Sequence, residues 1–286
     1  YVMENGDPSD IVTDYIKDRP LISFASSEHP FILRFLITIF EHFFGWRKVE
    51  SIYHQVKPTP FSIETFVKNA FQVAQIDHQF NEKQLRKIPD SGPLVFVANH
   101  PFGVIDGIAL CDLAVRTRGD FRILIHAIMC QDEDLARHFL PVDFSKTKAA
   151  TRNNIRSKRI AKKALEEGIP LLIFPSGFVS TADRFGLGHV EEAPWTTFAA
   201  KMIRDAKATV VPVYFKGQNS RIFHVASHFS EALRSLALLN EVTKRFNKPV
   251  FTTIGEPLLW EKLEPIADRK TLTQFLYYEV QKLKPQ

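Results

Sequence analysis

Short apolar runs alternate with amphipathic segments along most of the chain after residue 90. Each run has the length of a strand and carries almost no charge, which is the pattern of parallel strands covered on both faces. The predicted strands are Leu94–Ala98, Arg122–Ala127, Leu171–Phe174, Val210–Phe215 and Val250–Ile254. The segments between them predict helices over Asp106–Arg116, Arg152–Glu167 and Pro194–Ala206, with Gly168 suited to a helix C-terminus and Pro194 to a first turn. The alternation predicts a single α/β domain with a largely parallel central sheet flanked by helices.

The first 60 residues follow a different pattern, in which prolines interrupt helical segments. We interpret residues 1–60 as an N-terminal helical arm and residues 61–286 as the α/β domain, which opens with helices near 62–76 and 81–88. Residues 31–46 are strongly apolar, but the segment is too short to span a bilayer and is interrupted by Arg34 and Glu41. Two interpretations stay open for it: a helix lying in the membrane interface, or an arm packed against the domain.

Composition narrows the function only slightly. The net charge of +5 implies a weak attraction to polyanions, without selecting anionic lipid, an acidic carrier protein or nucleic acid. The 25 phenylalanines against 6 tyrosines suit a dry core or membrane contact. The segment Lys146–Lys163 is densely basic and is either a solvated helix face or a docking surface for an acidic carrier or an anionic membrane. The two cysteines form no metal-type pair, which fits a reducing compartment.

Three predicted strands end in segments rich in glycine, proline and polar residues. Because the carboxyl ends of parallel strands meet at one edge of a sheet, we expect a ligand site there. The segments are Asn99–Asp106, Phe174–Thr181 and Lys216–Arg221.

His100 and Asp106 are the candidate catalytic pair in the first of these segments. A turn at the rim of the sheet can place the carboxylate beside the imidazole, fix its tautomer and stabilise the imidazolium. The pair would then be a general base without an enzyme nucleophile. The competing interpretation is structural: Asp106 is a good helix N-cap and His100 a satisfied rim histidine.

Several motifs, in this order, resemble the lysophospholipid acyltransferase superfamily, and most closely its bacterial branch of hemolysin-like and ornithine-lipid acyltransferases. The resemblance covers roughly residues 90–260. The motifs are Asn99 to Gly103, Leu140 to Asp143 with Arg152 and Asn153, Phe174 to Gly177, and Asn219 to Arg221. Five residues separate His100 from Asp106, as in the hemolysin-like branch, whereas the commonest family pattern has four. Ser176 stands where the wider family carries a phosphate-binding Glu, and the nearest following arginine is Arg184.

The resemblance implies acyl transfer from a thioester, on acyl-carrier protein or acyl-CoA, to the hydroxyl of a lysolipid. His100 would be the general base, oriented by Asp106, and backbone N–H groups in the Ser176–Phe178 turn are candidates for oxyanion stabilisation. The enzyme is expected to lie peripherally on the cytoplasmic face of the inner membrane and to use no cofactor, metal or nucleic acid. The candidate substrate-binding residues are Asn99, Arg152, Ser176, Gly177, Arg184, Asn219 and Arg221.

Other chemistries fit the sequence less well. Ser176 lacks the glycine two positions earlier that a serine nucleophile elbow needs. His224 and His228 have helical metal-ligand spacing but no neighbouring glutamate, so zinc is disfavoured. Two alternatives remain: a membrane-binding module without catalysis, and a lipid or thioester hydrolase on the same scaffold. Free fatty acid without an acylated product would reveal the hydrolase, and salt-dependent binding without transfer would reveal the binding module.

Overall fold

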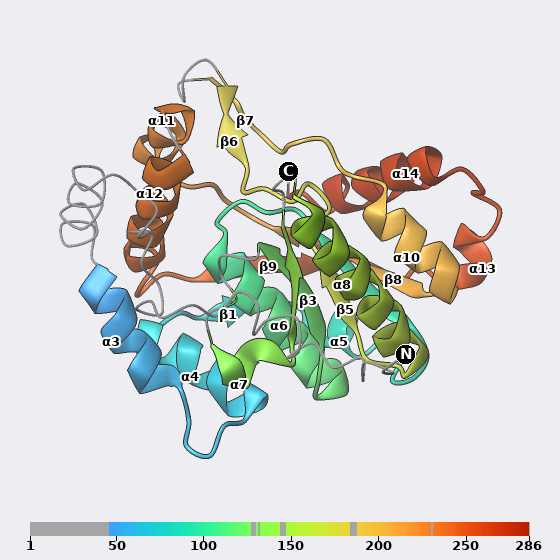
Figure 1. The fold of residues 1–286 in the computed structure, drawn as a ribbon, viewed down its shortest axis with the longest axis horizontal. Helices are drawn as coiled ribbons and strands as arrows, with labels where there is room; N and C mark the ends of the chain where they lie inside the picture. Colours follow the sequence, from blue (N-terminus) through green and yellow to red (C-terminus); the bar gives the residue numbers. More distant parts are fainter. Residues whose placement is uncertain are drawn as a thin grey trace.

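The computed structural model describes residues 46–126, 130, 132–143, 147–183, 188–229 and 231–285. Its centre is a seven-stranded sheet with the strand order β1-β9-β8-β2-β5-β3-β4 (Figure 1). Five neighbouring strands, from β8 to β4, run parallel, whereas β9 is antiparallel to β8 and β1 is parallel to β9. The predicted largely parallel α/β sheet is therefore confirmed. The strands are β1 (His78–Gln79), β2 (Leu94–Ala98), β3 (Arg122–His126), β4 (Phe139–Val142), β5 (Leu171–Ile173), β8 (Thr209–Phe215) and β9 (Val250–Ile254).

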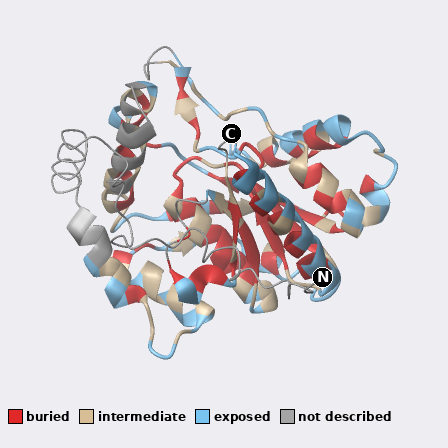
Figure 2. Cartoon of the chain, in the orientation of Figure 1, coloured by how far each residue is buried: buried red, intermediate tan, exposed pale blue. Residues whose placement is uncertain are grey.

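Helices cover both faces of this sheet. Strand β2 is fully buried, and its successive side chains point to opposite faces: Phe96 packs with one apolar core and Val97 with the other. Helices α4 and α6 belong to the first core, and α8, α10 and α14 to the second (Figure 2). The described helices are α3 (Trp46–Val56), α4 (Ile63–Ala74), α5 (Glu82–Leu85), α6 (Val104–Arg118), α7 (Glu133–Ala136), α8 (Lys148–Glu166), α10 (Phe198–Ala206), α11 (Arg221–Phe229), α12 (Glu231–Lys244), α13 (Trp260–Leu263) and α14 (Arg269–Gln281).

Two elements differ from the sequence-based expectation. Strand β4 contains Pro141, which argues against a strand in the sheet interior, but β4 lies at the sheet edge, where a missing N–H donor is tolerated. Helix α10 begins at Phe198 and not at Pro194. The residues before it lie against the loop after β5. There the N–H and the hydroxyl of Thr196 donate hydrogen bonds to the carbonyl of Pro175 at 2.9 and 3.1 Å.

A short antiparallel hairpin of β6 (Thr181–Ala182) and β7 (Val190–Glu191) lies outside the main sheet and contacts α11 (Figure 1). His224 Nδ1 accepts a hydrogen bond from the N–H of Ala182 at 3.2 Å, and His228 Nε2 lies 2.8 Å from the Ala182 carbonyl. These two histidines therefore anchor the hairpin. Within the described ranges, no three His, Cys, Asp or Glu side chains gather as metal ligands would.

Most of the predicted N-terminal arm, including residues 31–45, lies outside the described residues. Its described part, α3, is fastened to the domain by Asp132, which caps α7, accepts a hydrogen bond from the Tyr53 hydroxyl and lies 2.9 Å from Lys57 Nζ. None of the helices that the structure describes is long and apolar enough to cross a membrane.

Candidate active site

The three loops singled out from the sequence follow β2, β5 and β8, which are adjacent in the sheet. Because these strands are parallel, their loops meet at one edge. Asn99 holds two of them together: its side chain donates to the Phe215 carbonyl at 2.9 Å and accepts from the Phe215 N–H at 2.7 Å. The amide of Asn99 thus extends the pairing of β2 with β8 by one residue and sets the direction in which His100 leaves the sheet.

His100 and Asp106 lie next to each other, with 3.2 Å between His100 Nδ1 and Asp106 Oδ1, although the angles fall outside those of a formed hydrogen bond. The imidazole stacks on Phe174 with 3.9 Å between the ring centroids and 22° between the planes. The Ser180 N–H donates to the His100 carbonyl at 2.8 Å. Asp106 is completely buried, whereas 17% of the His100 side chain is exposed. The histidine is therefore held by its ring, its backbone and its acidic neighbour, with one side open to solvent.

Asp106 is not the N-cap of α6, because the helix begins at Val104 and its N-cap is Gly103. The carboxylate lies within the first turn instead, where its Oδ2 accepts from the Phe102 N–H at 2.9 Å and its Oδ1 from the Gly107 N–H at 3.0 Å. A carboxylate in this position is stabilised by the positive end of the helix dipole. These bonds bend the chain between His100 and the helix so that the acid returns to the imidazole.

Gly103 permits this bend. Its φ of +93° is strained for other residues, and a Cβ there would lie 2.8 Å from Leu238 and 3.2 Å from Val179. The loop after β2 therefore passes closely between α12 and the loop after β5.

The loop after β5 forms a tight turn beside His100. The N–H of Gly177, which has a φ of +71°, donates to the Phe174 carbonyl at 2.9 Å, so this N–H stabilises the turn. Ser176 is 2% exposed and its hydroxyl donates to the Phe178 carbonyl at 3.0 Å. We expected both residues in the substrate site, and the structure places them at the imidazole but engages their polar groups within the turn.

The loop after β8 packs on Phe102, the residue between His100 and the bend. A Cβ on Gly217 would lie 2.4 Å from the tip of the Phe102 ring, and the guanidinium of Arg245, just after α12, stands 3.8 Å from the ring centroid. Asn219 is buried, donates weakly to the Phe102 carbonyl at 3.4 Å, and its Oδ1 has no hydrogen-bond partner among the described residues. A buried acceptor without a donor is costly unless a ligand supplies one.

Two of the three predicted headgroup arginines lie within the described residues, and both are exposed. Arg152 is exposed on the N-terminal half of α8 and Arg221 is exposed at the first position of α11. Arg184 lies outside the described residues. A role for Arg152 and Arg221 in substrate binding therefore requires that the substrate reach the rim of the site.

Glu192 is a site residue that the sequence analysis missed. It follows β7, and its carboxyl group lies close enough to His100, Asp106 and Ser176 for all three to influence its pKa. Burial raises the pKa of Glu192 to about 7, against the lowering effect of Trp195, Ser176 and His100. Little in the sequence signals this role, since Glu191 and Glu192 look like an ordinary acidic pair in a loop.

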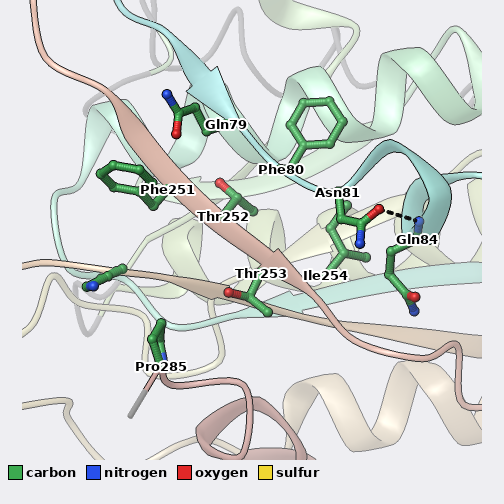
Figure 3. A pocket seen from close by; sticks show the side chains of 10 residues that line it. Gln79, Phe80, Asn81, Gln84, Phe251, Thr252, Thr253, Ile254 and Pro285 are labelled. Atoms are coloured by element: carbon green, nitrogen blue, oxygen red, sulfur yellow. Dashed lines mark hydrogen bonds between the residues drawn. The ribbon is translucent and has the colours of Figure 1, made fainter.

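A hollow of about 520 Å³ opens elsewhere, at the outer edge of the sheet where β9 runs past the end of the short strand β1 (Figure 3). Its walls include Phe80, Phe251, Thr252 and Thr253, and β9 is two strands away from β2. None of the residues predicted to carry catalysis lines it, so the candidate site remains the edge formed by the three loops.

The known proteins to which this chain is similar are acyltransferases. A profile described as acyltransferase matches residues 23–278. The lyso-glycine lipid O-acyltransferase of Phocaeicola vulgatus is 26% identical over 272 residues, which cover 91% of each chain. A protein of the same name from Bacteroides thetaiotaomicron is 25% identical over 274 residues, covering 91% of this chain and 93% of that one. The fold is similar to the crystal structure of the 1-acyl-sn-glycerophosphate (LPA) acyltransferase, PlsC, from Thermotoga maritima, with a TM-score of 0.51, 15% identity and coverage of 77% and 76%.

Proposed function

The chain belongs to the acyltransferase family, and from this premise we propose that it is an O-acyltransferase that moves a fatty acyl group from a thioester to the hydroxyl of a lysolipid. The observation that carries the proposal is the His100–Asp106 pair, built by two backbone hydrogen bonds into the bend after β2. The names of the two relatives support a lyso-glycine lipid as acceptor. The alternative acceptor is a lyso-ornithine lipid, which the motifs suggested. Assay of the purified protein with each lysolipid and one acyl thioester distinguishes them.

The proposed mechanism uses His100 as the general base. With Nδ1 facing Asp106, the other ring nitrogen, Nε2, is the one that takes the acceptor's proton as the hydroxyl oxygen attacks the thioester carbonyl. Asp106 stabilises the imidazolium, which then returns the proton to the leaving sulfur. For the developing oxyanion, the N–H of Gly177 is engaged in its turn, so the backbone donors of Ser176 and Phe178 are the better candidates. Asn219 Oδ1, which is buried and has no hydrogen-bond partner among the described residues, is our candidate to accept a hydrogen bond from the acceptor lipid.

We propose acyl-carrier protein, and not acyl-CoA, as the donor, because of the charge distribution on α8. The helix starts after β4, so its N-terminal half lies at the site edge of the sheet. That half exposes Lys148, Arg152 and the apolar Ile155, whereas at the other end Lys162 and Lys163 lie 3.7 and 3.8 Å from Glu166 and Glu167. A positive field around an apolar side chain suits an acidic carrier surface.

The double charge reversal Lys148→Glu with Arg152→Glu should raise KM for the acyl-carrier donor by about tenfold. Charges at the rim of an interface act mainly on the rate at which the two proteins associate. The variant should remain folded, because both side chains are exposed and a glutamate at position 148 would lie in the first turn of α8, where acidic residues are favourable. Steady-state rates with acyl-carrier protein and with acyl-CoA measure the effect, and Lys163→Glu at the far end of α8 is the control. An equal rise in KM with both donors would instead indicate a site for the phosphopantetheine arm that the two donors share.

We further propose that the enzyme lies peripherally on the cytoplasmic face of the inner membrane, with the site edge towards the lipid. Besides Ile155, two exposed apolar side chains among the described residues lie at this edge: Phe178 in the loop after β5, and Ile222 at the start of α11 beside the exposed Arg221. Apolar side chains flanked by a cation are typical of a surface that enters the headgroup region.

The variant Phe178→Ser with Ile222→Ser should weaken binding to vesicles of phosphatidylcholine and phosphatidylglycerol by about tenfold or more, because each side chain contributes up to roughly 1.5–3 kcal/mol on burial. Vesicle co-sedimentation measures it. The control is Leu259→Ser, whose side chain is exposed to a similar extent. Leu259 lies at the opposite edge of the sheet, because its neighbour Leu258 pairs with Val210 near the start of β8. Equal binding by the double variant and the wild type would place the membrane contact on another surface.

A further inference from the structure

Arg245 lies at the catalytic bend, although it belongs to none of the sequence motifs. It directly follows α12, and its guanidinium stands 3.8 Å from the centroid of the Phe102 ring. The N–H of Phe102 donates to Asp106 Oδ2 at 2.9 Å, and Asp106 Oδ1 lies 3.2 Å from His100 Nδ1. The guanidinium is therefore connected to the candidate base through two residues that are in direct contact.

The guanidinium of Arg245 has no carboxylate partner among the described residues. Its Nη2 donates to the Gln218 carbonyl at 2.9 Å, and it forms no ion pair with a described Asp or Glu. Glu241, one turn earlier in α12, would be the usual partner. Its carboxylate instead accepts from the N–H and hydroxyl of Ser220 at 2.8 and 2.6 Å and lies 2.9 Å from Lys244 Nζ. Because a guanidinium carries several N–H donors, Arg245 keeps donors for a ligand.

Asn219 supplies an acceptor next to this cation. The carbonyl that Arg245 contacts belongs to Gln218, and so to the peptide group that leads into Asn219. Asn219 is 3% exposed, its amide nitrogen donates to the Phe102 carbonyl at 3.4 Å, and its Oδ1 is buried without a partner among the described residues. A buried acceptor in this state costs stability unless a ligand supplies the donor. A free cation and a free acceptor therefore both lie against Phe102.

A carboxylate beside an amide N–H is the ligand that fits these two groups. The planar guanidinium binds a carboxylate through two parallel hydrogen bonds, and the asparagine oxygen accepts from the N–H. An amino acid joined to a fatty acid through its nitrogen carries these two groups on either side of one carbon atom. Both of the acceptors considered above are built on an amino acid, glycine or ornithine, whereas the phosphate of a lysophosphatidate offers no amide N–H.

We propose that Arg245 and Asn219 form the headgroup subsite of the acceptor, in which Arg245 binds the carboxylate of an N-acylated amino acid and Asn219 accepts from its amide N–H. The inference rests on the proposed function and deepens it, because it names the part of the acceptor that is recognised. The subsite forms no covalent bond and exchanges no proton, so its effect falls on binding of the acceptor. Recognition here leaves the hydroxyl of the same molecule free to approach His100.

Two probes without the acceptor hydroxyl test the subsite by binding alone: N-dodecanoylglycine, which carries the carboxylate, and N-dodecanoylglycinamide, its neutral counterpart. In isothermal titration calorimetry, the wild type should bind the carboxylate with about tenfold or more higher affinity, because hydrogen bonds between charged groups are the stronger ones. Arg245→Gln should bind both probes with nearly equal affinity. Arg245→Lys keeps the charge without the planar fork and should retain part of the preference. Asn219→Ala should weaken both probes alike, since both carry the amide N–H.

The matched control is Lys248→Gln, which removes the same charge from an exposed side chain three residues later and should leave the preference unchanged. Equal affinity of the wild type for the two probes overturns the proposal. Equal weakening of both probes in Arg245→Gln does so too, because the arginine would then only support the loop. If Arg245→Gln does not fold, Arg245→Lys decides, and a preference as large as that of the wild type shows that the guanidinium fork is not used.

Kinetics separate this subsite from other anions that an arginine could bind. With a lyso-glycine lipid as acceptor, Arg245→Gln should raise KM for the lysolipid by about tenfold or more and leave KM for the acyl thioester unchanged. A rise confined to the thioester would assign the guanidinium to a phosphate of the donor. Weaker binding to phosphatidylglycerol vesicles with an unchanged probe preference would assign it to the membrane surface, and either result contradicts the proposal. If the wild type acylates no lysolipid, the proposed function fails, while the two probes still decide the subsite.

Discussion

Replacement of His100 by alanine is expected to abolish acyl transfer while the domain stays folded. A hydroxyl is a poor nucleophile until a base removes its proton, and loss of such a base costs about 100- to 10,000-fold in rate. The side chain belongs to a loop and to neither apolar core, and it stacks on Phe174 at the margin of one of them, so its removal should leave the strands in place. Mass spectrometry of lipids from a host expressing the wild type or the variant, with rates of the purified proteins, measures the effect.

The chain supplies a matched control for this experiment. His78 also pairs with a buried aspartate, since its Nδ1 lies 2.7 Å from Asp112 Oδ2, but its Nε2 lies 2.9 Å from Thr252 Oγ1. His78→Ala should therefore lower stability and leave the turnover of the folded protein unchanged. Retention of more than about one tenth of the activity in His100→Ala would remove His100 from the role of base.

Asp106→Asn should lower turnover by several orders of magnitude, because it favours the wrong tautomer of His100. The carbonyl of the new side-chain amide can still accept from the Phe102 N–H, which leaves the amide NH₂ at the position of Oδ1, 3.2 Å from His100 Nδ1. An NH₂ group there donates to Nδ1 and keeps the ring proton on Nε2, so Nε2 cannot act as the base. In the serine protease triad, the corresponding change costs about 10⁴ in rate.

In Asp106→Asn the Gly107 N–H loses its side-chain acceptor but still donates to the Gly103 carbonyl at 3.1 Å. The free energy of unfolding should therefore fall by only about 1 kcal/mol. Thermal unfolding and kcat are measured together. Asp112→Asn, six residues later in the same helix, is the control that disturbs a histidine pair outside the site. Normal turnover with reduced stability in Asp106→Asn would show that the acid only shapes the bend.

The centre of the main sheet was largely predictable from the sequence because β2 and β5 are continuous apolar runs. Phe96 and Val97 bury their side chains on opposite faces, and no polar residue interrupts β2. The edges were not predictable by the same reasoning. β1 has two residues, β4 contains Pro141, and the reversed direction of β9 depends on the path of α11 and α12, which periodicity does not report.

The candidate site was predictable where its residues come from one loop. His100 and Asp106 are near in sequence, and the structure brings their side chains together as expected. Their catalytic roles remain predictions. Glu192 was not predictable, because it reaches Ser176 from a segment whose course is set by hydrogen bonds of Thr196 to a distant loop. The sequence also contains a second His and Asp pair, His78 and Asp112, and spacing alone does not say which pair lies at the strand ends.

Phe102 has Gly217 at the tip of its ring and Arg245 against it at 3.8 Å from the centroid. Three segments far apart in the chain therefore share one small volume. In evolutionary terms, a substitution at one of these three positions constrains which residues are tolerated at the other two. A side chain at position 217 is compatible only with a smaller residue at position 102, and a smaller residue there leaves the Arg245 guanidinium without its aromatic partner. Among descendants of this sequence, the three should be inherited as a set.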